Sequence, residues 1–159
     1  MIVRRAERKD ARQILALLGQ VLEVHAAIRP DIFVSGTTKY TKEQLFEIFE
    51  DETRLSFVAE EGETVLGYAL CEIREPKKAE NLVPFRSLYI DDLCVDESAR
   101  GKGVGTRLFE YVKTEAVKLG CYEVTLNVWE GNGPAKAFYD RMGMKPKETL
   151  MELILKEEK

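Results

Sequence analysis

The sequence is poor in the residues that metal centres and disulfide frameworks need. It contains one histidine, His25, and three cysteines, Cys71, Cys94 and Cys121, with no CxxC spacing among them. An odd number of widely spaced cysteines argues against a disulfide framework, and a single histidine excludes a multi-histidine metal site. Each cysteine stands among apolar or strand-like neighbours. We therefore expect three buried free thiols, a cytoplasmic location and no bound metal.

Long apolar runs and an excess of basic charge are also missing. No segment approaches the roughly 20 apolar residues that span a bilayer, and charged residues stand where a secretory signal would have its apolar stretch. Acidic side chains (28) outnumber basic ones (24), which gives a net charge of −4. This balance disfavours nucleic acid and anionic membranes as partners, whereas a cationic small amine is electrostatically compatible.

What the chain does have is enough apolar material for one folded domain. Its 159 residues are 45% apolar, and no repeat, low-complexity stretch or linker divides them. The length suits a single domain of ordinary size, and the apolar fraction is too high for a disordered chain. We therefore expect one domain over residues 1–159.

The periodicity of the apolar residues predicts an α/β fold. We expect strands over residues 1–6, 55–60, 64–73, 86–95 and 123–129, and one or two more within 144–155. We expect helices over residues 7–24, from Thr41 onward, from a glycine-rich turn to Leu119, and from Asn132 to Gly143. Strand, helix and strand between residues 86 and 129 form a central βαβ unit with parallel strands, and the earlier strand pair forms an antiparallel hairpin. The prediction is a mixed sheet with helices on both faces.

Three alternate glycines, Gly101, Gly103 and Gly105, stand where a predicted strand passes into a helix. A helix start leaves up to four backbone N–H groups unpaired and carries about half a positive charge. Glycines let a ligand approach the backbone closely, and Arg100 and Lys102 add positive charge nearby. The turn is therefore predicted to bind phosphate oxygens.

The spacing of these glycines excludes two familiar phosphate motifs. A P-loop ends in Gly-Lys-Ser/Thr, whereas Gly105 is followed directly by Thr106. The dinucleotide fingerprint requires GxGxxG, but the glycines here read GxGxG. A nucleotide-dependent kinase is therefore disfavoured.

The glycine turn resembles the acetyl-CoA signature of the GNAT N-acetyltransferase superfamily. That signature is Arg or Gln, two residues, Gly, one residue, then Gly or Ala, and it maps onto Arg100, Gly103 and Gly105. A second signature of the superfamily matches Asn132, Ala135, Phe138, Tyr139 and Gly143. The two motifs occur in the family's order, and the predicted order of strands and helices is also that of the family, so the resemblance extends over most of the chain.

The resemblance implies acetyl-CoA as co-substrate and no metal. The pyrophosphate of CoA would then be held by Arg100, Gly101, Lys102, Gly103, Val104, Gly105 and Thr106. The pantetheine arm would lie along the backbone of Leu93, Cys94 and Val95 like an added strand. Asn132 would contact the cofactor near the mouth of its site, a role compatible with capping the last helix.

Acetyl transfer to an amine requires a proton donor for the thiolate and a proton acceptor for the amine. By resemblance, Tyr139 occupies the position of the family's acid and is the candidate proton donor; a core tyrosine with a paired hydroxyl is the alternative. The run Ile-Asp-Asp-Leu-Cys-Val looks like the acidic pair of the polyamine and diamine acetyltransferases, whose base maps onto Asp91. Strand alternation places Asp91 and Asp92 on opposite faces unless a bulge intervenes, and exposed strand-end charges are the alternative reading.

The remaining acceptor-site candidates follow from the same resemblance. Asp92, Tyr89 and Phe33 are candidates for holding the substrate. The expected function is direct acetyl transfer from acetyl-CoA to a small cationic amine, without a covalent enzyme intermediate. A protein N-terminal or lysine acetyltransferase and a non-catalytic acyl-CoA-binding module are the alternatives. Members of the family often dimerise, so a homodimer is a candidate state.

Overall fold

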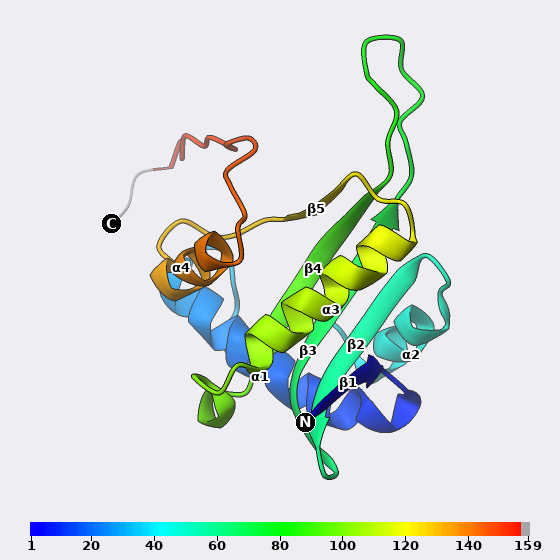
Figure 1. Ribbon diagram of the computed structural model, residues 1–159. Coiled ribbons are helices and arrows are strands. Elements are labelled where there is room, and N and C mark those ends of the chain that lie inside the picture. The colour runs from blue at the N-terminus through cyan, green and yellow to red at the C-terminus, as the bar shows by residue number, and fades with distance from the viewer. Residues whose placement is uncertain (157–159) are drawn as a thin grey trace.

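A five-stranded sheet in the order β1-β2-β3-β4-β5 forms the middle layer of the protein (Figure 1). The computed structural model describes residues 1–156. The strands are β1 (Ile2–Arg5), β2 (Arg54–Glu61), β3 (Thr64–Arg74), β4 (Ser87–Val95) and β5 (Glu123–Leu126). All neighbours are antiparallel except β4 and β5, which are parallel. The expected hairpin and parallel βαβ unit are both confirmed, with β5 as the last strand of the described sheet.

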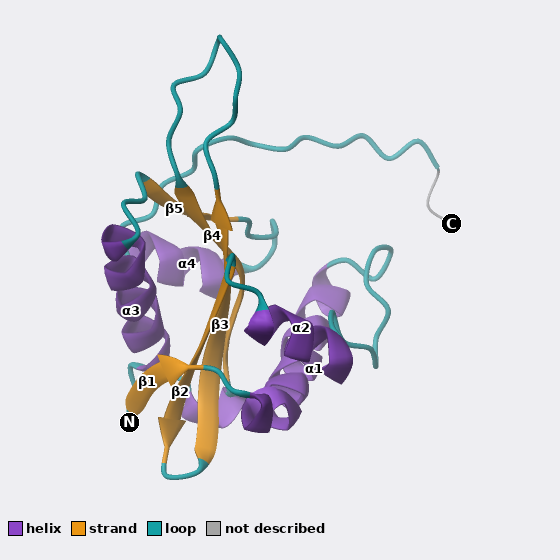
Figure 2. Ribbon diagram, turned by 90° about the vertical axis from the view of Figure 1, so that its right-hand side faces the viewer, coloured by secondary structure: helices purple, strands orange, loops and turns teal. Residues whose placement is uncertain are grey.

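Helices cover both faces of this sheet, as the sequence predicts. They are α1 (Ala11–Ile28), α2 (Lys42–Glu50), α3 (Val104–Lys118) and α4 (Gly133–Arg141), with short 3-10 turns at Arg8–Asp10 and Glu97–Ala99. Figure 2 shows α1 and α2 on one side of the strands and α3 and α4 on the other. Within residues 1–156, no helix combines the length and apolar character required to cross a membrane.

Each face of the sheet has its own apolar layer. Beneath α1 and α2 the buried side chains include Ile14, Leu18, Leu45, Val58, Tyr68 and Leu70. Beneath α3 they include Phe57, Ala69, Leu88, Leu108, Phe109 and Val112. Burial of these side chains, at about 1.5–3 kcal/mol for each large one, holds the three layers together.

The helix ends follow the local sequence signals. Thr41 and Gln44 form the expected capping box. The Thr41 hydroxyl accepts the Gln44 backbone N–H at 3.2 Å, and the Gln44 side-chain carbonyl accepts the Thr41 backbone N–H at 2.9 Å. Asn132 caps α4 by accepting the Ala135 N–H at 3.3 Å. Gly120 follows α3 with φ of 71°, the left-handed conformation that ends helices.

Four sequence expectations need correction. The first helix begins as a 3-10 turn and continues to Ile28, beyond the expected end at residue 24. Strand β5 ends at Leu126 instead of 129, because its partner β4 bulges at the same level. Cys121 is only half-buried, since it lies in the connection between α3 and β5, whereas the other two cysteines are buried.

The strands expected within residues 144–155 are the fourth correction. The described part of this segment is extended but pairs with no strand of the sheet. Strand periodicity is a property of the segment alone, whereas a strand also requires a neighbour that supplies hydrogen bonds. The segment leaves α4 and lies outside the sheet (Figure 1), with Lys147 paired to Glu123 and Glu152 paired to Arg29.

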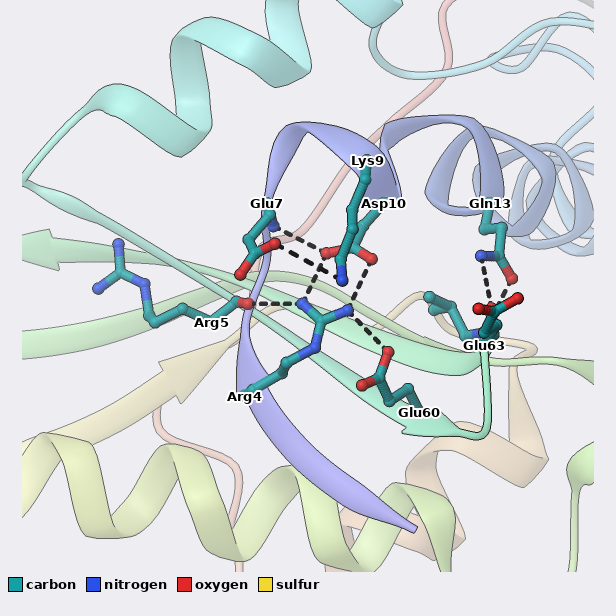
Figure 3. Close-up of polar contacts among 9 residues, drawn as sticks. Arg4, Arg5, Glu7, Lys9, Asp10, Gln13, Glu60 and Glu63 are labelled. Atoms are coloured by element: carbon teal, nitrogen blue, oxygen red, sulfur yellow. Dashed lines mark hydrogen bonds and ion pairs between the residues drawn. The ribbon is translucent and has the colours of Figure 1, made fainter.

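A buried ion-pair network ties the first strand to the start of α1 and to β2 (Figure 3). The Arg4 guanidinium contacts Asp10 at 2.8 and 2.9 Å and Glu60 at 2.7 Å. Asp10 is only 2% exposed and also accepts the Glu7 N–H at 2.8 Å. Burial alone raises the pKa of Asp10, but the hydrogen bonds from Arg4 and Glu7 outweigh it and leave the pKa below its ordinary value.

We predict that Asp10→Asn lowers the free energy of unfolding by about 3 kcal/mol, because it leaves a partly buried guanidinium without its closest anion. Because the folded pKa of Asp10 is depressed, its contribution is present above the unfolded pKa of about 3.9 and is lost as the pH falls through the folded pKa. Urea unfolding between pH 2 and pH 7 should therefore show a flatter acid limb in the variant.

The matched control is Glu50→Gln, which removes an exposed partner of Arg8 at 3.0 Å. Both side chains of that pair are about two-thirds exposed, at 64% and 65%, so a change of at most about 0.5 kcal/mol is expected. Equal losses in the two variants would contradict the structural role of the Arg4 network.

Candidate active site

The site begins where β4 and β5 part. The two strands pair from Ser87 and Glu123 to Ile90 and Leu126, and β5 ends there. Strand β4 continues to Val95, so its last five residues present an open edge on the side that β5 has left. Open strand edges carry unpaired N–H and C=O groups that an extended ligand can use.

A bulge in β4 lies at the same level. Leu70 of β3 pairs with Asp92 and Cys71 pairs with Ile90, so Asp91 is an extra residue without a partner. The extra residue breaks the strict alternation of the strand. Asp92 lies opposite Leu70, which belongs to the apolar layer beneath α1 and α2, and Asp91 contacts the segment before α2. The bulge therefore turns both carboxylates toward the same face, the exception that strand alternation allows.

Two side chains from the segment between α1 and α2 hold Asp91. The Lys39 ammonium donates to one carboxylate oxygen at 2.9 Å, and the Tyr40 hydroxyl donates to the other at 2.5 Å. Burial raises the pKa of Tyr40 above its ordinary value, and the hydrogen bond to Asp91 raises it further. Tyr40 thus stays protonated as a donor, and the Asp91 carboxylate, in the middle of β4 where β5 has ended, lies beside the primary ammonium of Lys39.

Asp92 lies deeper in the protein. Burial raises the pKa of Asp92 to about 6, Lys39 opposes the shift, and the neighbouring Asp91 charge adds to it. The Tyr68 hydroxyl is fully buried and has no hydrogen-bond partner among residues 1–156. Burial raises the pKa of Tyr68 well above its ordinary value, with the Asp92 carboxylate as the next cause. A carboxyl group that titrates near neutral pH has the character expected of a functional site.

Tyr139 approaches this region from α4. It packs against the core beneath α3, with its ring 6.4 Å from Phe109 and 5.1 Å from Phe138. Burial raises the pKa of its hydroxyl above the ordinary value, and the Asp92 carboxylate is the next cause. No hydrogen bond to another described residue contributes to this shift, so the paired hydroxyl of an ordinary core tyrosine is not what the structure shows.

The glycine turn has the backbone that anion binding requires. Gly101 and Gly103 have φ of 78° and 80°, in the left-handed region that favours glycine. Gly103 precedes the first residue of α3, and no side chain caps this helix. The amides of Val104, Gly105 and Thr106 have no intrahelical acceptor, since each belongs to the first turn. These amides and the positive end of the helix are the features that bind phosphate oxygens at helix N-termini.

Gly105 is needed for close packing, and its backbone conformation is one that other residues also adopt. A Cβ at this position would lie 3.1 Å from the Phe138 ring, closer than side chains normally approach. The absence of a side chain lets α4 lie directly against the glycine turn. Among the expected basic contributors, Arg100 and Lys102 are both exposed beside the turn.

The three residues expected along the pantetheine arm lie on the open part of β4. Leu93 and Val95 pack against the core beneath α3, whereas Cys94 belongs to the opposite layer. Burial raises the pKa of the Cys94 thiol to about 12, and the Asp92 charge contributes. A thiol that stays protonated at neutral pH is not a nucleophile, in agreement with the expectation that no acyl-cysteine forms.

The two remaining acceptor-site candidates, Phe33 and Tyr89, lie on different elements of the fold. Phe33 lies between His25 and Trp129, with ring centroids 5.2 and 5.3 Å away. Tyr89 lies on the same face as Asp91, and its hydroxyl donates to Asn127 at 2.8 Å. The Tyr89 ring lies under the guanidinium of Arg74 at 3.8 Å. Within the described residues, no group of three His, Cys, Asp or Glu side chains is arranged to hold a metal ion.

Sequence reasoning misses two residues of this arrangement, Lys39 and Tyr68. Lys39 stands in a polar loop and contacts Asp91 across 52 positions of sequence, which no local pattern predicts. From the sequence alone, Tyr68 cannot be distinguished from an ordinary buried aromatic side chain of β3. The one available signal is its place on the strand beside the acidic pair, where its partner across the ladder is Cys94.

Comparisons with known proteins agree with this fold. A model of the acetyltransferase (GNAT) family matches residues 21–144. The glucosamine 6-phosphate N-acetyltransferase of Arabidopsis thaliana is 28% identical over 153 residues, covering 94% of this chain and 93% of that protein. The thialysine N-epsilon-acetyltransferase of Bos taurus is 27% identical over 154 residues, covering 90% of this chain and 83% of that protein.

A solved structure is similar over nearly the whole chain. The crystal structure of a mutant of the BH1408 protein from Bacillus halodurans has a TM-score of 0.94 at 31% identity, covering 98% of this chain and 99% of that one. The family match spans well over half of the sequence and includes the glycine turn, the open edge of β4 and α4. The chain therefore belongs to the acetyltransferase (GNAT) family, whose enzymes transfer an acetyl group from acetyl-CoA.

Proposed function

We propose that the protein acetylates the primary amine of a small cationic molecule by direct transfer from acetyl-CoA, within one domain that spans the chain. The observation that carries the choice of acceptor is the contact between Lys39 and Asp91. At the open end of β4, a carboxylate already holds a primary ammonium at 2.9 Å. A substrate ammonium finds the same partner when it displaces the lysine.

The residues present fit acetyl-CoA as co-substrate. Unpaired amides from Gly101 to Thr106, with Arg100 and Lys102 beside them, suit the pyrophosphate. The open edge from Leu93 to Val95 suits the amides of the pantetheine arm. Asn132, the N-cap of α4, would contact the cofactor, as the resemblance to the family implies. Acetyl-CoA supplies the activated acetyl group, and the chain supplies position and proton transfer.

The acid and the base are assigned to residues of two different elements, Tyr139 on α4 and Asp91 on β4. A free alkyl ammonium has a pKa of about 10.4 and must lose a proton before its nitrogen can attack. We assign Asp91 as the acceptor of that proton, directly or through one water. Tyr139, which burial keeps protonated, donates to the departing thiolate. Each positioned group of this kind contributes about 10²- to 10⁴-fold to the rate.

The negative charge of the acidic pair supports a cationic acceptor. Asp92 lies behind Asp91, and its charge adds to the potential that attracts an ammonium. Phe33 and Tyr89 are the aromatic candidates for contacting the substrate, because aromatic rings bind alkyl and cationic groups favourably. The names of the two relatives above specify amino-bearing small molecules, a phosphorylated glucosamine and thialysine, which also supports a small acceptor.

The function is tested by following release of free thiol from acetyl-CoA with a panel of diamines, polyamines, amino sugars and amino acids. We predict turnover with at least one cationic member of the panel. Tyr139→Phe should lower kcat by roughly 10²-fold or more, because the thiolate then leaves without a donor. The affinity for coenzyme A, measured by calorimetry, should change little.

Tyr122→Phe is the matched control, since the Tyr122 side chain is 75% exposed and remote from α4. It should leave kcat at the wild-type value. A protein that binds coenzyme A but releases no thiol with any amine would be a binding module and would contradict the proposed activity. Unchanged kcat in Tyr139→Phe would remove that residue from the mechanism.

The neighbouring Asp91 and Asp92 carboxyl groups give a prediction about how the acetylation rate depends on pH. Because the pKa of Asp92 is raised to about 6, its negative charge develops as the pH rises through that value. The ratio kcat/KM for a cationic amine should therefore rise through about pH 6, and Asp92→Asn should lack this rise. Asp91→Asn should keep the rise but lower kcat at every pH by roughly 10²-fold, since the proton acceptor is gone.

These two variants serve as controls for each other, because they are adjacent and chemically identical changes. Rate measurements from pH 5 to pH 9 at constant ionic strength are required. A rise near pH 6 that persists in Asp92→Asn would assign it to another group, and an unaltered kcat in Asp91→Asn would exclude Asp91 as the base.

A further inference from the structure

Lys39 occupies the position that the proposed function gives to the substrate amine. From this geometry we infer that Lys39 is itself an acetyl acceptor, so that the enzyme carries a modification site inside its own active site. The inference rests on the proposed function, because it uses the same base and the same acetyl donor.

Contacts at the bulge single out this lysine. Its ammonium lies 2.9 Å from the Asp91 carboxylate and 3.4 Å from the Asp91 carbonyl oxygen, at the point where β4 becomes open. The side chain is 46% exposed, so it can move aside or advance without disturbing the core. Lys42, three residues further on, lies over the Phe46 ring at 5.6 Å instead. Lys136 pairs with Glu130 at 2.7 Å.

The step balances with the groups already named. The Lys39 ammonium gives one proton to Asp91, and its nitrogen attacks the carbonyl carbon of the acetyl thioester. The new C–N bond forms as the C–S bond breaks, and Tyr139 protonates the sulfur. The nitrogen then loses its second proton, which restores the Tyr139 hydroxyl through water, and Asp91 releases the first proton to solvent. The products are Nε-acetyl-lysine at position 39 and free coenzyme A.

Acetylation removes the positive charge that competes with a cationic substrate for Asp91. The ion pair with Asp91 is then lost, and the Asp91 carboxylate keeps the Tyr40 hydroxyl as its remaining described partner. The modification thus reports acetyl-CoA exposure in the absence of amine and changes the charge of the acceptor site.

The test incubates the purified protein with acetyl-CoA alone and follows the acetylation of each lysine by peptide mass spectrometry. Lys39 should be acetylated roughly 10²-fold faster than Lys42, at a first-order rate independent of protein concentration. Tyr139→Phe and Asp91→Asn should reduce Lys39 to the rate of Lys42. Lys42→Arg, the matched control, should leave the Lys39 rate unchanged.

Equal slow rates at Lys39 and Lys42, in wild type and Tyr139→Phe alike, would mean chemical acetylation only and would overturn the inference. A rate that rises with protein concentration would also overturn it, since the lysine would then be a substrate between copies. If the protein acetylates external amines while Lys39 is acetylated only at the background rate, this inference is wrong and the proposed function stands. If the protein binds no coenzyme A, the proposed function is wrong as well.

Discussion

The separation of β4 from β5 is the constraint on which the site depends. While the strands are paired they are an ordinary parallel ladder, and once β5 turns away, β4 presents bare backbone to a ligand. The bulge at Asp91 occurs at the same level and brings two carboxylates to one face. Helix α3 begins at Val104, beyond the glycine turn that follows β4, with an uncapped N-terminus. The open edge and the acidic pair thus lie at one break in the sheet, and the glycine turn lies further along the same segment of chain.

The acidic pair shows how neighbouring residues of one type acquire different properties. Asp91 contacts a lysine and a tyrosine at the surface, whereas Asp92 lies in the interior, where burial raises its pKa to about 6. Desolvation acts on the buried group, and direct partners act on the other. The division allows one carboxylate to receive an ammonium while the other sets the charge behind it.

The features that sequence predicts well are those that local chemistry decides. The caps at Thr41 and Asn132 depend on side chains three residues from their partners, and the positive φ of Gly103 depends on a missing Cβ. Order and direction of the strands follow from the βαβ and hairpin patterns. The Lys39 contact and the early end of β5 depend instead on segments far apart in the chain, so periodicity does not reveal them. For the extended tail, the pattern is strand-like but the described chain holds no partner for it.

Gly105 links two parts of the site that sequence motifs describe separately. Its missing side chain lets the Phe138 ring rest on the first turn of α3, and Tyr139 is the next residue of α4. An alanine there would push the ring outward and tilt the neighbouring phenol with it. In the proposed function, the turn that binds the diphosphate and the orientation of the acid are therefore coupled, so a substitution that disturbs one also disturbs the other.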